Sequence, residues 1–102
     1  RMSQEAEIPT RIFVDNRGHP SFTIVDIQTP DRIGLLYELF GALADLGLSL
    51  ELARITTERE VALDTFYVYR SSDGAKLSGE DEIRDLQRAL HKAATGTAEA
   101  VS

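Results

Sequence analysis

Residues 29–36, TPDRIGLL, are the stretch of this sequence whose residue types are best suited to holding a small molecule. Pro30 stiffens the approach to a helix. Asp31 suits the N-cap, where its carboxylate would accept a hydrogen bond from the backbone N–H of Ile33 or Gly34. Because free N–H groups at a helix start attract anions, the carboxylate of a small amino acid would fit on this turn. The structural alternative is a capped helix in which Gly34 serves only close packing.

Other reactive side chains lack the spacing that catalysis or metal binding requires. His19 and His91 have no second histidine or cysteine at ligand spacing. The serines lie in no nucleophile elbow, and the chain has no glycine-rich nucleotide loop. Asp26 and Asp64 lie in strand patterns, where they either pair across a sheet or point to its open face. We therefore expect no catalytic residue, no metal and no cofactor in this chain.

The composition narrows the class of protein. The 102 residues suit one domain. The 17 acidic and 11 basic residues give a net charge of −6, which argues against a nucleic-acid partner because phosphate contacts need a basic surface. No apolar run is long enough for a membrane span, and no secretory signal or cysteine occurs, so we expect a cytoplasmic protein. Arg1 precedes Met2, which suggests a piece of a longer parent or a tagged chain.

Apolar residues alternate with polar ones in four runs, and this period of two predicts strands. The predicted strands are Thr10–Asn16, Ser21–Gln28, Leu48–Glu58 and Val61–Arg70. The first two are joined by the turn residues RGHP and should form a hairpin. The last two should form a second hairpin with Arg59 and Glu60 at its tip.

Two other runs have the helical period. The first follows the opening motif, with an apolar face of Leu36, Leu39, Phe40, Leu43 and Leu46. Its opposite face holds Gly34, Glu38, Gly41 and Asp45. Gly47 should end it, because that position favours the left-handed backbone of glycine. The second helix should begin at Ser78, in a capping box with Asp81, and should bury Ile83, Leu86, Leu90 and Ala93.

The predicted order is therefore β-β-α-β-β-α, in the α+β class. We expect a ferredoxin-like sandwich, in which a four-stranded antiparallel sheet carries both helices on one face. The strand Thr10–Asn16 would replace the last strand of the usual order at one sheet edge. Residues 1–9 are interpreted as a linker, 10–94 as the domain and 95–102 as a flexible tail.

The stretch TPDRIGLLYELFGALADLGLSLELARI resembles the signature of the ACT domain family. The matching residues are Asp31, Gly34, Leu35 and Leu36, then Leu43, Leu46 and Gly47, then Ala53 and Ile55. With IPTRIFVDN before it and LDTFYVYRSSDGAKL after it, the chain is most similar to the C-terminal ACT domain of bifunctional PII uridylyltransferase/uridylyl-removing enzymes. The resemblance covers about residues 8–93.

This resemblance implies a regulatory domain that binds an amino acid, glutamine in that subgroup, and that pairs with another ACT domain. The ligand turn would consist of Asp31, Arg32, Ile33, Gly34 and Leu35, and the paired domain would contribute Leu48, Ser49 and Leu50. Two departures support the alternative of a ligand-free dimerisation module or ACT-repeat protein. Ser49 stands where many ACT domains have asparagine. Arg59 stands where relatives usually have glycine, which leaves the type of that turn open.

Overall fold

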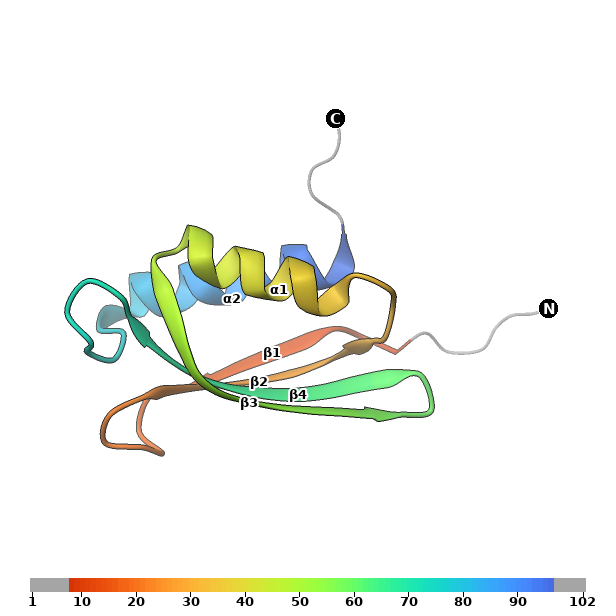
Figure 1. Ribbon diagram of the computed structural model, residues 1–102, viewed down its shortest axis with the longest axis horizontal. Coiled ribbons are helices and arrows are strands. Elements are labelled where there is room, and N and C mark those ends of the chain that lie inside the picture. The colour runs from red at the N-terminus through yellow and green to blue at the C-terminus, as the bar shows by residue number, and fades with distance from the viewer. Residues whose placement is uncertain (1–7, 97–102) are drawn as a thin grey trace.

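The computed structural model describes residues 8–96, and Figure 1 shows its helices above one layer of strands. The elements are β1 (Arg11–Asp15), β2 (Thr23–Pro30), α1 (Leu35–Asp45), β3 (Leu48–Glu58), β4 (Val61–Arg70) and α2 (Gly79–Thr95). This is the predicted order of strands and helices. Most of the predicted linker and tail, residues 1–7 and 97–102, lies outside the described residues.

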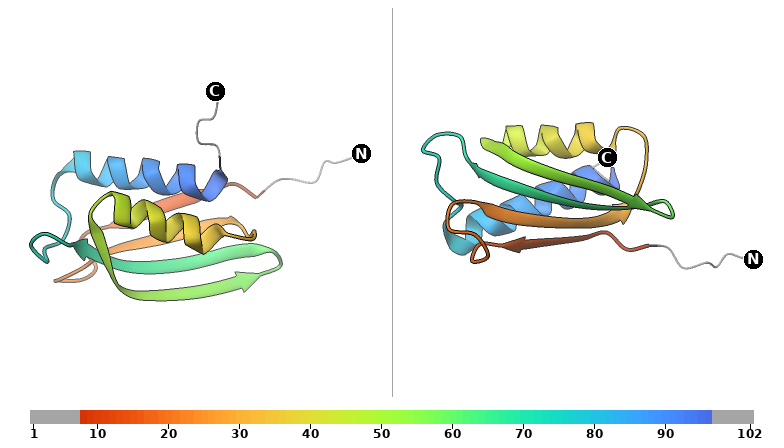
Figure 2. Two further views of the ribbon diagram at one scale, coloured as in Figure 1. Left: turned by 45° about the horizontal axis from the view of Figure 1, so that its top comes forward. Right: turned by 60° about the horizontal axis from the view of Figure 1, so that its bottom comes forward.

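The strands form one antiparallel sheet in the order β1-β2-β4-β3. The first hairpin pairs Arg11 with Gln28 and Asp15 with Ile24, which places β1 at one edge of the sheet. Strand β3 forms the other edge. Both helices cover the same face, and the opposite face is left open (Figures 1 and 2). The predicted α+β sandwich, with the N-terminal strand at the sheet edge, is therefore confirmed.

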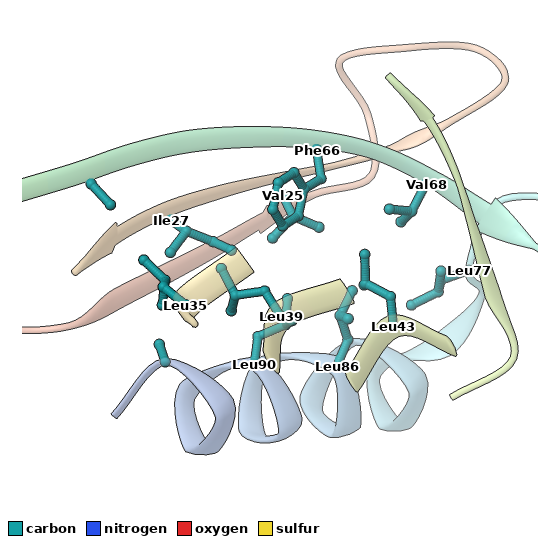
Figure 3. Close-up of a cluster of buried hydrophobic side chains, with 12 residues drawn as sticks. Val25, Ile27, Leu35, Leu39, Leu43, Phe66, Val68, Leu77, Leu86 and Leu90 are labelled. Carbon is teal, nitrogen blue, oxygen red and sulfur yellow. The ribbon is translucent and has the colours of Figure 1, made fainter. Parts of the chain in front are cut away.

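The core lies between the sheet and the two helices (Figure 3). In β2 and β4 every second residue is buried, as the period of two predicts. These strands contribute Val25, Ile27, Phe66 and Val68 to the core. Helix α2 packs over β1, whereas α1 packs over β3, so each helix covers one half of the sheet.

The buried face of α1 differs from the predicted one. It is formed by Leu35, Leu39 and Leu43, while Phe40 and Leu46 are more than one-third exposed. The helix is rotated from the predicted position because the first residue of the pattern is Leu35 rather than Leu36. In α2 the buried residues are Leu86, Leu90 and Ala94, and the predicted Ile83 and Ala93 are partly buried against the same core.

The end of α1 agrees with the prediction from the sequence, whereas the start of α2 corrects it. Gly47 has a φ of 75° and donates its N–H to the carbonyl of Ala44, so it ends α1 as predicted. The predicted capping box of Ser78 with Asp81 is wrong. Glu82 instead accepts from the Ser78 N–H at 2.6 Å, because Asp81 is paired with Arg84 one turn further on.

The hairpin between β3 and β4 has a two-residue tip. Arg59 and Glu60 have φ values of 52° and 69°. Positive φ at both positions is the requirement of a type I′ turn, which matches the right-handed twist of the flanking strands. Neither residue is a glycine, so this tip carries local backbone strain.

A cluster of aromatic side chains lies on the open face of the sheet. The rings of Phe22 and Tyr69 have centroids 5.8 Å apart, and the ring of His19 lies 4.9 Å from Phe22 and 6.0 Å from Tyr67. Asp26 is also on this face, where Thr65 donates its hydroxyl to it. Among the described residues, no helix is both long and apolar enough to cross a membrane.

Candidate functional site

The turn between β2 and α1 contains the predicted ligand residues, and it is held by its own backbone. The N–H of Asp31 donates to the carbonyl of Glu60 at 2.8 Å, which ties the turn to the second hairpin. The N–H of Leu35 donates to the carbonyl of Arg32 at 3.2 Å. These two bonds close the turn before the helix begins.

Asp31 is not the N-cap of α1, which corrects the prediction. The N-cap is Gly34, with φ 85°, and no side chain makes a capping hydrogen bond there. The first helical bond runs from the N–H of Glu38 to the carbonyl of Gly34 at 3.0 Å. The helix therefore starts three residues later than an Asp31 cap would require, because the intervening residues form the turn described above.

The first turn of α1 leaves backbone donors uncovered. Within residues 8–96, the N–H groups of Leu36 and Tyr37 have no hydrogen-bond partner. Apart from its immediate chain neighbours, a Cβ atom added to Gly34 would meet no atom within 4 Å, so the space beside this glycine is open. The structural alternative assigned Gly34 a role in close packing, and the open space around it excludes that role. Its positive φ is the reason that a glycine suits this position.

The other residues of the turn point in different directions. Ile33 is 99% exposed and reaches into solvent, whereas Leu35 is 2% exposed and belongs to the core. The side chain of Arg32 turns away to α2, where Nη2 donates to the carbonyl of Ala93 at 2.6 Å. The turn therefore exposes the side chain of Ile33 to solvent and buries that of Leu35.

The second predicted group, Leu48, Ser49 and Leu50, lies at the start of β3. Leu48 and Ser49 are half-buried, and the hydroxyl oxygens of Ser49 and Ser71 are 2.6 Å apart. This group follows the C-terminal end of α1, while the turn precedes its N-terminal end (Figure 1). The 11 residues of α1 span about 16 Å. One chain therefore does not bring the two predicted halves of the site together.

A pocket beside the start of β3 was not predicted. It has a volume of about 530 Å³ and its apolar wall includes Leu46, Leu77 and Leu86. Arg70 lies on its rim and contacts Asp73 at 2.9 Å and Glu82 at 3.1 Å. Spacing in the sequence signals the contact of Arg70 with Asp73, but not the contact with Glu82 twelve residues away.

These contacts fix the charges on the rim of the pocket. Two carboxylates beside its guanidinium raise the pKa of Arg70. The hydrogen bond from Arg70 is the main cause of the lowered pKa of Asp73. The pKa of Glu82 is lowered chiefly by the backbone N–H of Ser78 and further by Arg70. All three groups are thus charged at neutral pH.

The described residues contain one buried carboxylate outside these groups. Asp64 is 2% exposed and lies on the helix side of the sheet, whereas Asp26 lies on the open side, so the two do not pair. Burial raises the pKa of Asp64. Within residues 8–96, no group of three or more His, Cys, Asp and Glu side chains is arranged to hold a metal ion.

Comparison with known proteins places this geometry in context. A family model described as an ACR9-like, ACT-like domain matches residues 11–97. The bifunctional uridylyltransferase/uridylyl-removing enzyme of Ruegeria pomeroyi is 41% identical over 92 residues, which cover 90% of this chain and 10% of that protein.

Two further proteins with the same name are similar to this chain. The protein of Azospirillum brasilense is 36% identical over 92 residues, which cover 89% of this chain and 10% of that protein. The protein of Rhodospirillum rubrum is 33% identical over 90 residues, which cover 88% of this chain and 10% of that protein. The chain thus spans about a tenth of the length of these relatives. No solved structure matches it significantly.

Proposed function

The chain belongs to the family of ACT-like domains, and on this premise we propose that it senses an amino acid, glutamine, for a PII uridylyltransferase-like enzyme of nitrogen regulation. Its regulatory class follows from the family and from its similarity to the uridylyltransferase/uridylyl-removing enzymes. The glutamine and the parent enzyme are inferred from that similarity. The chain itself would bind the amino acid and transmit that binding to the rest of the parent enzyme, while catalysis would belong to other parts of the parent.

The observation that carries the proposal is the uncovered first turn of α1. The N–H groups of Leu36 and Tyr37 have no partner in the described residues, and the space beside Gly34 is open. The aligned peptide dipoles make this end of a helix positive. A carboxylate can accept hydrogen bonds from both N–H groups and is attracted by that charge. An amino acid would therefore rest its carboxylate here.

The site would need a second ACT domain to be complete. The ligand turn and the start of β3 lie at opposite ends of α1, so the group Leu48, Ser49 and Leu50 would come from a paired copy. Strand β3 supports such pairing, because it forms a sheet edge and exposes Leu50, Leu52 and Ile55. Exposed apolar edge strands pair readily with other strands.

Regulation requires that the ligand bind one conformation of the parent more tightly than another. The coupling free energies of known allosteric proteins are about 1–3 kcal/mol. One charge-assisted hydrogen bond contributes roughly 1.5–3 kcal/mol, so a single such bond made in only one of the two conformations supplies a coupling of this size. The proposed contacts are therefore strong enough to shift a parent between two states.

Isothermal titration calorimetry of the chain with L-glutamine tests the proposal. Ile33 offers a matched pair of variants, since its side chain is almost fully exposed and contributes little to stability. Ile33→Asp would place a carboxylate beside the uncovered donors and should abolish the heat of binding. Ile33→Asn has nearly the same shape without the charge and should retain affinity within a few-fold. Equal binding by both variants would remove the site from this turn.

The second candidate function is a pairing module without a ligand. The exposed apolar edge of β3 favours it, as does Ser49, whose hydroxyl is already paired with that of Ser71. Size-exclusion chromatography with light scattering, run beside the titrations, separates the two functions. A stable dimer that releases no heat with glutamine or with any other amino acid would establish the pairing module.

A further inference from the structure

The side chain of Arg32 connects the start of α1 with the end of α2. Its Nη2 donates to the carbonyl of Ala93 at 2.6 Å and its Nε donates to the carbonyl of Ala94 at 3.3 Å. Its Nη1 lies 3.4 Å from the carbonyl of Ile33, within the turn itself. One guanidinium thus spans two segments that are about 60 residues apart in the sequence.

These contacts stabilise the last turn of α2. The final four carbonyls of a helix have no partner within the helix, and Ala93 and Ala94 are among them. A positive charge at this end also interacts favourably with the helix dipole. The same turn is closed by the N–H of Gly96, which donates to the carbonyl of Lys92 at 2.9 Å. Protection of the Gly96 N–H therefore reports whether the last turn is formed.

The orientation of the guanidinium means that a carboxylate would compete with the carbonyls of α2 for the same edge of the group. Nε and Nη2 form one edge of its planar fork, and this edge faces the two carbonyls of α2. A carboxylate bound by the same two atoms makes a bidentate, charge-assisted pair, which is stronger than bonds to neutral carbonyls. The edge cannot hold α2 and a carboxylate at once.

We propose that Arg32 is a positioning residue that couples the turn to α2: a carboxylate bound at the start of α1 draws the guanidinium away from Ala93 and Ala94, and the last turn of α2 frays. This inference rests on the proposed amino-acid site. The two states are a capped and a frayed end of α2. Since the ligand favours the frayed state, loosening that end by other means must in turn strengthen ligand binding.

Hydrogen exchange of the Gly96 amide, measured by NMR with and without saturating L-glutamine, tests the coupling on the unmodified chain. Glutamine should speed this exchange by about tenfold, a factor that corresponds to about 1.4 kcal/mol. In Arg32→Gln the exchange should already be fast without ligand, and glutamine should add nothing. Arg84→Gln serves as the control, because Arg84 contacts Asp81 on the exposed side of α2, and it should behave like the unmodified chain.

The two proposals fail in different ways. If calorimetry shows that glutamine binds the unmodified chain while Gly96 exchange is unchanged or slowed, the coupling through Arg32 is wrong and the sensing function stands. If glutamine releases no heat, both proposals fail. The decisive comparison uses the unmodified chain, so the outcome does not depend on the folding of a variant.

Discussion

Thr56 donates its backbone N–H to one carboxylate oxygen of Asp64, at 3.2 Å, while the other oxygen of Asp64 is buried without a partner among residues 8–96. Burial is the main cause of the raised pKa of Asp64, and the negative charge of Asp31 adds to it. The bond from Thr56 acts in the opposite direction. A folded-state pKa above the unfolded value means that Asp64 favours folding at low pH, and this contribution is lost as pH rises through the folded-state pKa.

Asp64→Asn should therefore stabilise the chain at neutral pH. The amide keeps an oxygen for the Thr56 N–H and removes the buried charge, so the free energy of unfolding should rise on the order of 1 kcal/mol at pH 7. The gain should shrink as pH falls through the raised pKa of Asp64, where the carboxylate becomes protonated. Urea unfolding at several pH values measures this. Asp26→Asn, on the open face, is the control, and a variant less stable than the parent chain at pH 7 would contradict the prediction.

Gly34 and Gly41 should respond oppositely to alanine. Both have open space around the missing Cβ, but only Gly34 has a positive φ. Gly34→Ala should lose about 1–2 kcal/mol through backbone strain. Gly41→Ala lies within α1 and should gain about 0.5–1 kcal/mol. Thermal unfolding of the two variants gives the comparison, and an unchanged or raised stability of Gly34→Ala would contradict the role of its positive φ.

The second hairpin should be stabilised by residues that suit its tip. Replacing Arg59 and Glu60 by Asn and Gly supplies the residues that type I′ turns prefer. The double variant should gain about 1 kcal/mol in urea unfolding, because neither position would then be strained. The hydrogen bond from the Asp31 N–H to the carbonyl of residue 60 is retained. Glycine at Glu58 instead, inside the strand, should be destabilising.

The proposed pairing depends on the edge formed by β3. Ile55 is 44% exposed on this edge strand, and Leu63 is 37% exposed on the inner strand β4. Ile55→Lys should lower the fraction of dimer, since lysine on an edge strand opposes pairing. Leu63→Lys adds the same charge away from the edge and should leave the dimer unchanged. Light scattering after size exclusion compares the two, and an equal response would place the interface elsewhere.

The sheet and both helices were predictable from the sequence because their signals are local. The period of two in β2 and β4 and the glycine after α1 directly reflect burial and backbone conformation. The start of α1 was predicted wrongly. Asp31 has the side chain of an N-cap, but its N–H is bound to the carbonyl of Glu60, which comes from a distant hairpin.

The candidate site was predictable only in part for the same reason. The sequence indicates which residues form the turn, and the open space beside Gly34 agrees with a role as a binding surface. The direction of Arg32 depends on Ala93, which lies 61 residues away and carries no side-chain signal. Contacts to backbone carbonyls of another element leave no trace in residue type.

The length of α1 separates the two candidate half-sites. Two chains that are disabled in different half-sites should therefore complement each other when they pair. In a symmetric pair of the proposed kind, each ligand would sit between the turn of one chain and the strand of the other. A chain disabled in its turn, mixed with a chain disabled at Ser49, would then restore one working site per mixed pair. Either disabled chain alone would have none.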